Sequence, residues 1–171
     1  DDFDYDQQRW PVGAQQQRAE QICKRINAQL SAIGLDCHDT VLHWHNHGLG
    51  KNTAAPQVIA QLAREGWRLL LQIHDFAEDN RPENYARLIQ AIGAQDKASV
   101  DQYLYPVASQ LHYCTLTSGD AAVLQGLGIP AQQVGCLPNS VSAPPSAANA
   151  SEASPSDALN RLRKVLGLPS Q

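Results

Sequence analysis

Two stretches of the sequence decide the fold: TVLHWHNHGLGKN at residues 40–52 and RLLLQIHDFAEDNRP at residues 68–82. Each begins as an apolar strand and continues into a loop rich in His, Asp and Asn. A segment of the length of a crossover helix joins them, which predicts two neighbouring parallel strands. The carboxyl ends of parallel strands meet at one edge of a sheet, and ligands bind there. We therefore expect the functional site in these two loops.

Helical and strand patterns alternate along the rest of the chain. Apolar residues recur at spacings of three and four from Ala19 to Ile33, and Gly34 ends that predicted helix. Further strands are predicted at residues 111–116 and 133–137, with helical patterns between all of them. This rhythm predicts an α/β fold, a Rossmann-like doubly wound parallel sheet with helices on both faces. The strand residues expected in its core are Val41, Leu69, Leu71, Ile73 and Leu116.

Composition excludes several classes of protein. The chain has 171 residues, of which 43% are hydrophobic, and this is enough for one well-buried core. Its net charge of −4 indicates neither a nucleic-acid partner nor attraction to an anionic membrane. No apolar run approaches the ~20 residues of a membrane span, and no signal peptide is visible. Cys23 and Cys114 fall in apolar patterns, so we expect buried, reduced thiols in a cytoplasmic protein.

The composition changes after Val141. Residues 142–156 are rich in Ala, Ser and Pro and are interpreted as a linker, and residues 157–171 as a helix leading toward a further domain. Residues 1–141 then form the Rossmann-like domain. The sequence contains no Met, not even at position 1, and we expect it to be a piece of a longer protein.

The histidines of the first loop allow more than one interpretation. His43, His45 and His47 share the parity of a strand, and a continuing strand would point all three imidazoles to one side. With His74 and Asp75 they could form the metal site of a small metal-dependent hydrolase. However, the chain is too short for a barrel metallohydrolase and lacks a further ligand set at a recognisable spacing. A stand-alone α/β binding module is the other open alternative.

The segment from Leu116 to Val141 reads LTSGDAAVLQGLGIPAQQVGCLPNSV. It resembles the end of the N-terminal domain in GT-B glycosyltransferases of the family-4 type, where a Leu-x-x-x-Gly-Ile-Pro stretch precedes a strand closed by a Pro-Asn-Gly-Val turn. Here Ser140 stands in place of the turn glycine. Three more stretches resemble that family in the same order: the Gly-rich acceptor loop at 11–14, the strand ending in His at 72–75, and the segment before the second domain at 162–169.

The resemblance implies the acceptor-binding half of a hexosyltransferase that moves a sugar from a nucleotide-sugar donor to an acceptor hydroxyl. In that family the donor is held mainly by a C-terminal domain, so this chain is expected to be inactive alone. The implied partners are the nucleotide sugar and a sugar or polyol acceptor, and neither a cofactor nor a metal is implied.

The resemblance and the two loops together give the candidate site residues. His74 is the candidate catalytic residue, because the family places a His at this strand end against the donor sugar. The candidate substrate-binding residues lie in the loops around it, and for each a role within its own loop stays open. They are Gly13, for close backbone approach to a ligand, Asn46, His47 and Lys51, for an anionic acceptor or phosphate, Asp75, Glu78 and Asp79, for a polyol, and Asn139.

Overall fold

The computed structural model describes residues 6, 10–79 and 81–140. The predicted linker and the predicted C-terminal helix lie outside these residues. The elements follow one another as α1 (Ala14–Ala32), β1 (Val41–His45), α2 (Ala55–Arg64), β2 (Arg68–Ile73), α3 (Pro82–Ile92), α4 (Lys97–Leu104), β3 (Leu111–Thr115), α5 (Ser118–Gly126), the short 3-10 turn η1 (Ala131–Gln133) and β4 (Val134–Cys136).

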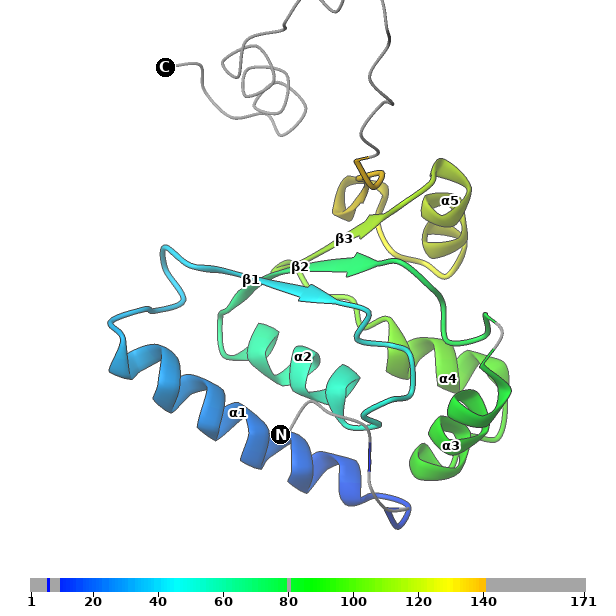
Figure 1. Cartoon of the computed structure of the whole chain (residues 1–171), viewed down its shortest axis with the longest axis horizontal. Helices are drawn as coiled ribbons and strands as arrows, with labels where there is room; N and C mark the ends of the chain where they lie inside the picture. Colours follow the sequence, from blue (N-terminus) through cyan, green and yellow to red (C-terminus); the bar gives the residue numbers. More distant parts are fainter. Residues whose placement is uncertain (1–5, 7–9, 80, 141–171) are drawn as a thin grey trace, which may run out of the picture. The chain divides into compact units, whose positions relative to one another are not determined.

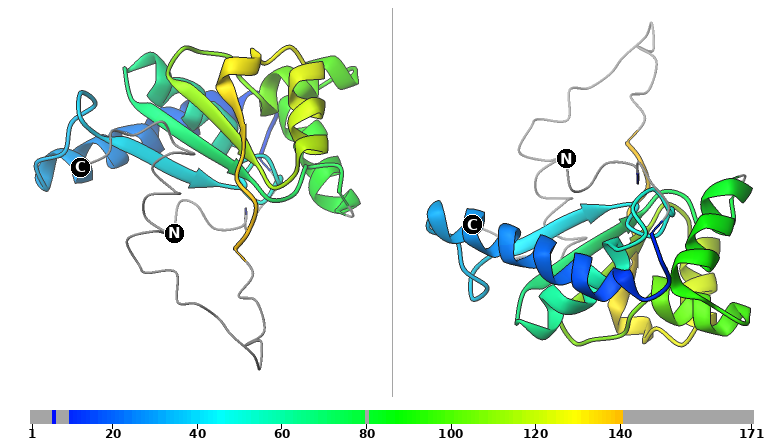
Figure 2. Two further views of the ribbon diagram at one scale, coloured as in Figure 1. Left: turned by 90° about the horizontal axis from the view of Figure 1, so that it is seen from above. Right: turned by 90° about the horizontal axis from the view of Figure 1, so that it is seen from below.

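The four strands form one parallel sheet in the order β1-β2-β3-β4. Figure 1 shows α1 and α2 on one side of β1 and β2, and α5 packs against β3 and β4. Seen from above, the strands lie in front of α1, and seen from below, α1 crosses in front of them (Figure 2). A parallel sheet flanked by helices confirms the predicted α/β, Rossmann-like fold class.

The core lies between the sheet and α2. Leu69 and Leu71 of β2 point into it and are almost completely buried, as is Ile73, so these three predictions are confirmed. Removing an aliphatic side chain of this size from water contributes roughly 1.5–3 kcal/mol. The other members of this layer are also nearly inaccessible, among them Val58, Ile59 and Leu62 of α2 and Leu111 and Tyr113 of β3.

Two of the predicted core residues do not belong to it. Val41 is 56% exposed, because it shares the parity of the exposed His43 and His45 on β1. Leu42 and Trp44 have the opposite parity, and they pack against the core as half-buried side chains. Leu116 is only half-buried, because it follows Thr115, the last residue of β3. Apolar residues at 41, 42 and 44 gave no single parity from which the inward face could be read.

The connection from β2 to β3 contains one more helix than the sequence pattern predicted. α3 ends at Ile92 and is capped by Gly93, whose φ of 66° is left-handed, and α4 begins directly after Asp96. The Asp96 carboxylate accepts hydrogen bonds from the backbone N–H and the hydroxyl of Ser99, at 2.8 and 2.7 Å. This N-cap stabilises α4, which in turn buries Val100 and Leu104.

Two further expectations from the sequence concern membrane-spanning helices and the cysteines. No helix among the described residues is long and apolar enough to cross a membrane. The four cysteines are unpaired thiols. Cys23 is buried as expected, and desolvation raises the pKa of its thiol to about 12, whereas Cys114 is half-buried.

Asn46 joins the ends of β1 and β2. It has a φ of 53°, in the left-handed region that Asn tolerates better than most residues. Its backbone N–H donates to the Gln72 carbonyl at 2.9 Å, and its Oδ1 accepts from the backbone N–H of His74 at 2.7 Å and more weakly from that of Asp75 at 3.4 Å. We call this set of bonds the Asn46 clamp. It ends β1 and turns the chain after it.

We expect Asn46→Ala to lower the free energy of unfolding by about 2–4 kcal/mol, because Ala strains the left-handed backbone and leaves two N–H groups without their acceptor. Asn46→Asp keeps the acceptor oxygen and tolerates the same φ, so it should lose less than about 1 kcal/mol. Urea denaturation of the three proteins measures both values. Equal losses in the two variants would show that the clamp does not depend on the Oδ1 acceptor.

Candidate functional site

A pocket of 230 Å³ opens beside the carboxyl end of β1. Its lining comes from the end of β1, the loop after it and the first residue of α2: Trp44, His45, Asn46, His47, Lys51, Asn52 and Ala55. The Asn46 clamp holds His74 against this loop, which confirms that His74 and the loop share one edge of the sheet. We call this cavity the β1 pocket.

Two imidazoles meet at this edge. His45 Nδ1 lies 3.0 Å from His74 Nε2, within hydrogen-bond distance, and the two rings stack with centroids 5.3 Å apart. His43 lies next to His45, with a distance of 4.3 Å between the two ring centroids. Its Nε2 is 3.0 Å from Gln72 Oε1. The register explains the meeting, because His45 pairs with Gln72 on β2 and His74 follows one residue beyond the end of that strand.

The charge of the His45–His74 pair is limited by its own hydrogen bond. One ring must accept, so that ring has to be neutral. The pKa of His45 is lowered mainly by desolvation and further by the nearby His43 and His74. In the tautomer in which His45 Nδ1–H donates to His74 Nε2, the second nitrogen of His45 can accept a proton or a hydrogen bond from a hydroxyl group, and the Nδ1–H of His74 can donate one.

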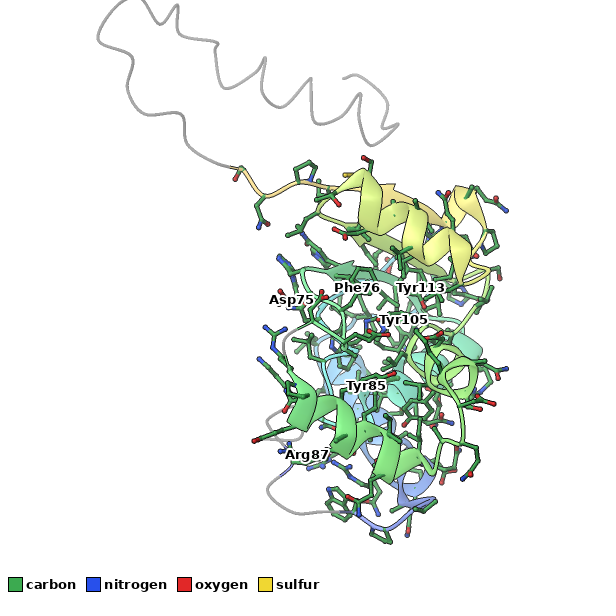
Figure 3. The ribbon with its side chains drawn as sticks, turned by 90° about the vertical axis from the view of Figure 1, so that its right-hand side faces the viewer. Asp75, Phe76, Tyr85, Arg87, Tyr105 and Tyr113 are labelled. Carbon is green, nitrogen blue, oxygen red and sulfur yellow. The ribbon has the colours of Figure 1, made fainter. Side chains whose placement is uncertain are left out.

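His47 does not join the other histidines of its loop, so the three imidazoles do not share one face. The strand ends at His45 and the left-handed Asn46 turns the next side chain inward. His47 is buried, its Nε2–H donates to the Leu104 carbonyl at 2.8 Å, and burial lowers its pKa to about 4. Its ring lies 6.2 Å from the rings of both Tyr105 and Tyr113, which Figure 3 shows inside the molecule.

This rearrangement bears on the metal-dependent hydrolase. Within residues 6, 10–79 and 81–140, no group of three or more His, Cys, Asp or Glu side chains is placed to hold a metal ion. The alternating spacing of the three histidines was the reason for that interpretation, and the inward turn at His47 removes it.

The three acidic residues after β2 each have a partner. Asp75 pairs with Arg81 at 3.1 Å, and Glu78 pairs with Lys97 of α4 at 3.1 Å. Asp79 Oδ2 accepts from the Phe76 N–H at 2.9 Å and so closes the loop on itself. Figure 3 shows Phe76 beside Tyr105, the ring centroids being 6.0 Å apart. These contacts brace the loop, and a role of the three carboxylates in binding a polyol stays a prediction.

The remaining candidates are three residues from separate segments of the chain. Gly13 has a φ of 85° directly before α1, a conformation that favours glycine. Lys51 lines the β1 pocket. Asn139 is exposed in the segment after β4. A contact of any of them with a substrate stays a prediction.

A buried polar cluster next to the pocket was not predicted from the sequence. The Asp6 carboxylate and the Arg18 guanidinium form an ion pair of 2.5 Å, and Thr53 and Gln15 surround it. A signal existed in α1, because Gln15 precedes the buried Ala19 by one helical turn and therefore faces inward. A glutamine in such a position requires a hydrogen-bonding partner inside the protein.

Comparison with known proteins gives one partial match. The chain is 29% identical over 131 residues to a mannosylglucosyl-3-phosphoglycerate synthase of Petrotoga mobilis (strain DSM 10674 / SJ95). The aligned part covers 75% of this chain and 24% of that protein, so the chain spans about a quarter of the relative's length. No protein-family model matches the chain. No solved structure matches it significantly.

We expect His47 to make the protein less stable in acid. Its pKa is lowered from about 6.5 to about 4 on folding, so the unfolded chain binds the proton more readily, and stability falls as the pH drops through that range. The loss attributable to His47 is about 3 kcal/mol between pH 6.5 and pH 4. His47→Gln keeps an N–H donor for Leu104 without titrating, and should remove this part of the pH dependence.

Urea denaturation at several pH values measures the effect, with His38→Gln as the control because His38 is exposed. The same acid dependence in His47→Gln as in the unmodified protein would show that His47 is not the titrating group.

Proposed function

We propose that this chain is the acceptor-binding part of a glycosyltransferase that moves a sugar from a nucleotide-sugar donor to a hydroxyl group. Two findings support the proposal. The partial relative is a glycosyltransferase. His45 lines the β1 pocket and lies 3.0 Å from His74, at the edge where parallel sheets bind ligands. The histidine pair is the observation that carries the proposal, since it supplies groups suited to a hydroxyl.

The chemistry of glycosyl transfer explains why such a pair is useful. The sugar passes through an oxocarbenium-like transition state while the departing diphosphate gains negative charge. The acceptor side must hold a hydroxyl in line with the anomeric carbon and contact the sugar through hydrogen bonds. In our proposal His74 makes the hydrogen bond to the donor sugar. His45 is a positioning residue that orients the His74 ring through the 3.0 Å bond.

We further propose the GT-B architecture of the family-4 type, with the nucleotide held mainly by a second domain. The order of the sequence motifs supports this, as does the length of the relative, of which the chain spans about a quarter. The acceptor would then lie in the β1 pocket, with the acidic loop after β2 along its rim.

The chain alone should transfer no sugar. In the proposed arrangement the electrostatic stabilisation of the departing diphosphate comes from the second domain, and this term carries a large share of the catalysis. Release of nucleoside diphosphate from a set of nucleotide sugars, with and without sugar acceptors, gives the measurement. Turnover by the 171-residue chain that survives repurification would contradict the assignment of this chain as the acceptor part.

In the full-length enzyme, His74→Ala should lower kcat about tenfold to a hundredfold, with a smaller change in acceptor KM, because a hydrogen bond that strengthens in the transition state acts on turnover. His74→Gln keeps a donor and should recover part of the rate. The control is His112→Ala, since His112 is an exposed residue of β3.

The melting temperature of each variant is measured on the same preparation. A loss of stability in His74→Ala with kcat near normal would reduce His74 to a residue that braces its loop.

A further inference from the structure

The buried cluster around Arg18 has the composition of an anion-binding site that the protein fills with its own carboxylate. Asp6 Oδ1 accepts from Arg18 Nη2 at 2.5 Å, and Asp6 Oδ2 accepts from the Thr53 backbone N–H at 3.0 Å and from the Thr53 hydroxyl at 2.7 Å. The side chains of Asp6 and Arg18 are only 2% and 13% exposed. The carboxylate is therefore held almost entirely by protein groups.

The groups around this carboxylate are positioned by contacts that do not involve it. Arg18 Nη1 also donates to Gln15 Oε1 at 3.0 Å, and Arg18 Nη2 lies 3.3 Å from Asn52 Oδ1. The guanidinium lies 4.2 Å from the centre of the Trp10 ring. Tyr103 donates to the Thr53 carbonyl at 2.8 Å. Four residues other than Asp6 therefore contact Arg18 or Thr53 and help to hold them in place.

The carboxylate leaves one donor of the cluster unused. Gln15 is buried and its Oε1 accepts from Arg18 and lies 3.1 Å from the Thr53 hydroxyl, so the amide group sits in the cluster. Its Nε2 is buried and has no hydrogen-bond partner among the residues that the structure describes. A buried amide N–H in that state costs about 1–3 kcal/mol. A planar carboxylate has two oxygens, whereas a phosphate group has a third that can accept from a further donor.

The position of the cluster indicates that its anion would be a group of a ligand bound in the β1 pocket. Thr53 lies at the start of α2, whose N-terminal end carries a partial positive charge. Asn52 lines the β1 pocket and its Oδ1 also lies within reach of Arg18. A ligand in the pocket can thus extend from the His45–His74 pair toward Arg18 along the loop that follows β1.

We propose that Gln15, Arg18 and Thr53 form an oxyanion site for a phosphate monoester group of the acceptor, and that Asp6 is an internal competitor for it. The assignment to the acceptor rests on the proposed function, but the binding of phosphate does not. The Asp6 backbone N–H donates to the Lys51 carbonyl at 2.8 Å, so Asp6 is fixed to the loop that forms the pocket wall. A phosphorylated acceptor would have to displace this carboxylate.

The test is the binding of inorganic phosphate to the 171-residue chain, measured by calorimetry and by the amide shift of Thr53 in NMR spectra. Asp6→Ala should bind phosphate at least tenfold more tightly than the unmodified chain, and phosphate should raise its melting temperature. Adding Arg18→Gln should abolish both effects. Asp39→Ala removes the same charge from an exposed position and should bind no more phosphate than the unmodified chain.

Acetate, which has two oxygens, should bind Asp6→Ala more weakly than phosphate does. Equal or tighter binding of acetate would overturn the assignment to phosphate, and no gain in phosphate affinity would show that Asp6 and Arg18 are only a structural ion pair. Asp6→Asn serves in the same measurements if Asp6→Ala does not fold. Because none of these readouts uses turnover, a lack of glycosyl transfer in the full-length enzyme would leave the phosphate result standing.

Discussion

The Asn46 clamp is the constraint on which the rest of the site depends. A single side-chain oxygen accepts from the backbone of His74 and Asp75, and the backbone N–H of the same residue pairs with Gln72. The clamp therefore fixes the ends of β1 and β2 relative to one another. It also turns the chain, so that His45 stays at the sheet edge while His47 enters the core. The same turn places Asn46 and His47 in the lining of the β1 pocket beside His45.

The two polar groups of the site illustrate how differently burial acts on charge. His45 and His74 lie at the carboxyl edge of the sheet, where desolvation and the neighbouring histidines lower the pKa of His45 and so favour its neutral ring. Asp6 and Arg18 are removed from water, and the cost of desolvating them is offset by their mutual attraction and by hydrogen bonds with Thr53 and Gln15. The first arrangement suits contact with a reacting hydroxyl, and the second suits recognition of a fixed negative charge.

The strength of the apolar patterns decided how much of the fold could be predicted. The run at 68–73 and the spacing from Ala19 gave β2 and α1 correctly, because both depend on local periodicity. The inward face of β1 could not be read, since Val41, Leu42 and Trp44 include both parities. His47 was misplaced because one left-handed residue reverses a side chain without changing the composition of the loop. The ion pair of Asp6 and Arg18 depends on tertiary contacts, for which this single sequence gave only the inward-facing Gln15 as a signal.

The most direct test of the central claim is a crystal structure of the full-length enzyme with an unreactive nucleotide-sugar analogue and an acceptor. We predict that His74 lies within hydrogen-bond distance of the donor sugar, and that the acceptor fills the β1 pocket with its reacting hydroxyl in line with the anomeric carbon. An acceptor bound elsewhere, with the pocket empty and His74 remote from the sugar, would contradict it.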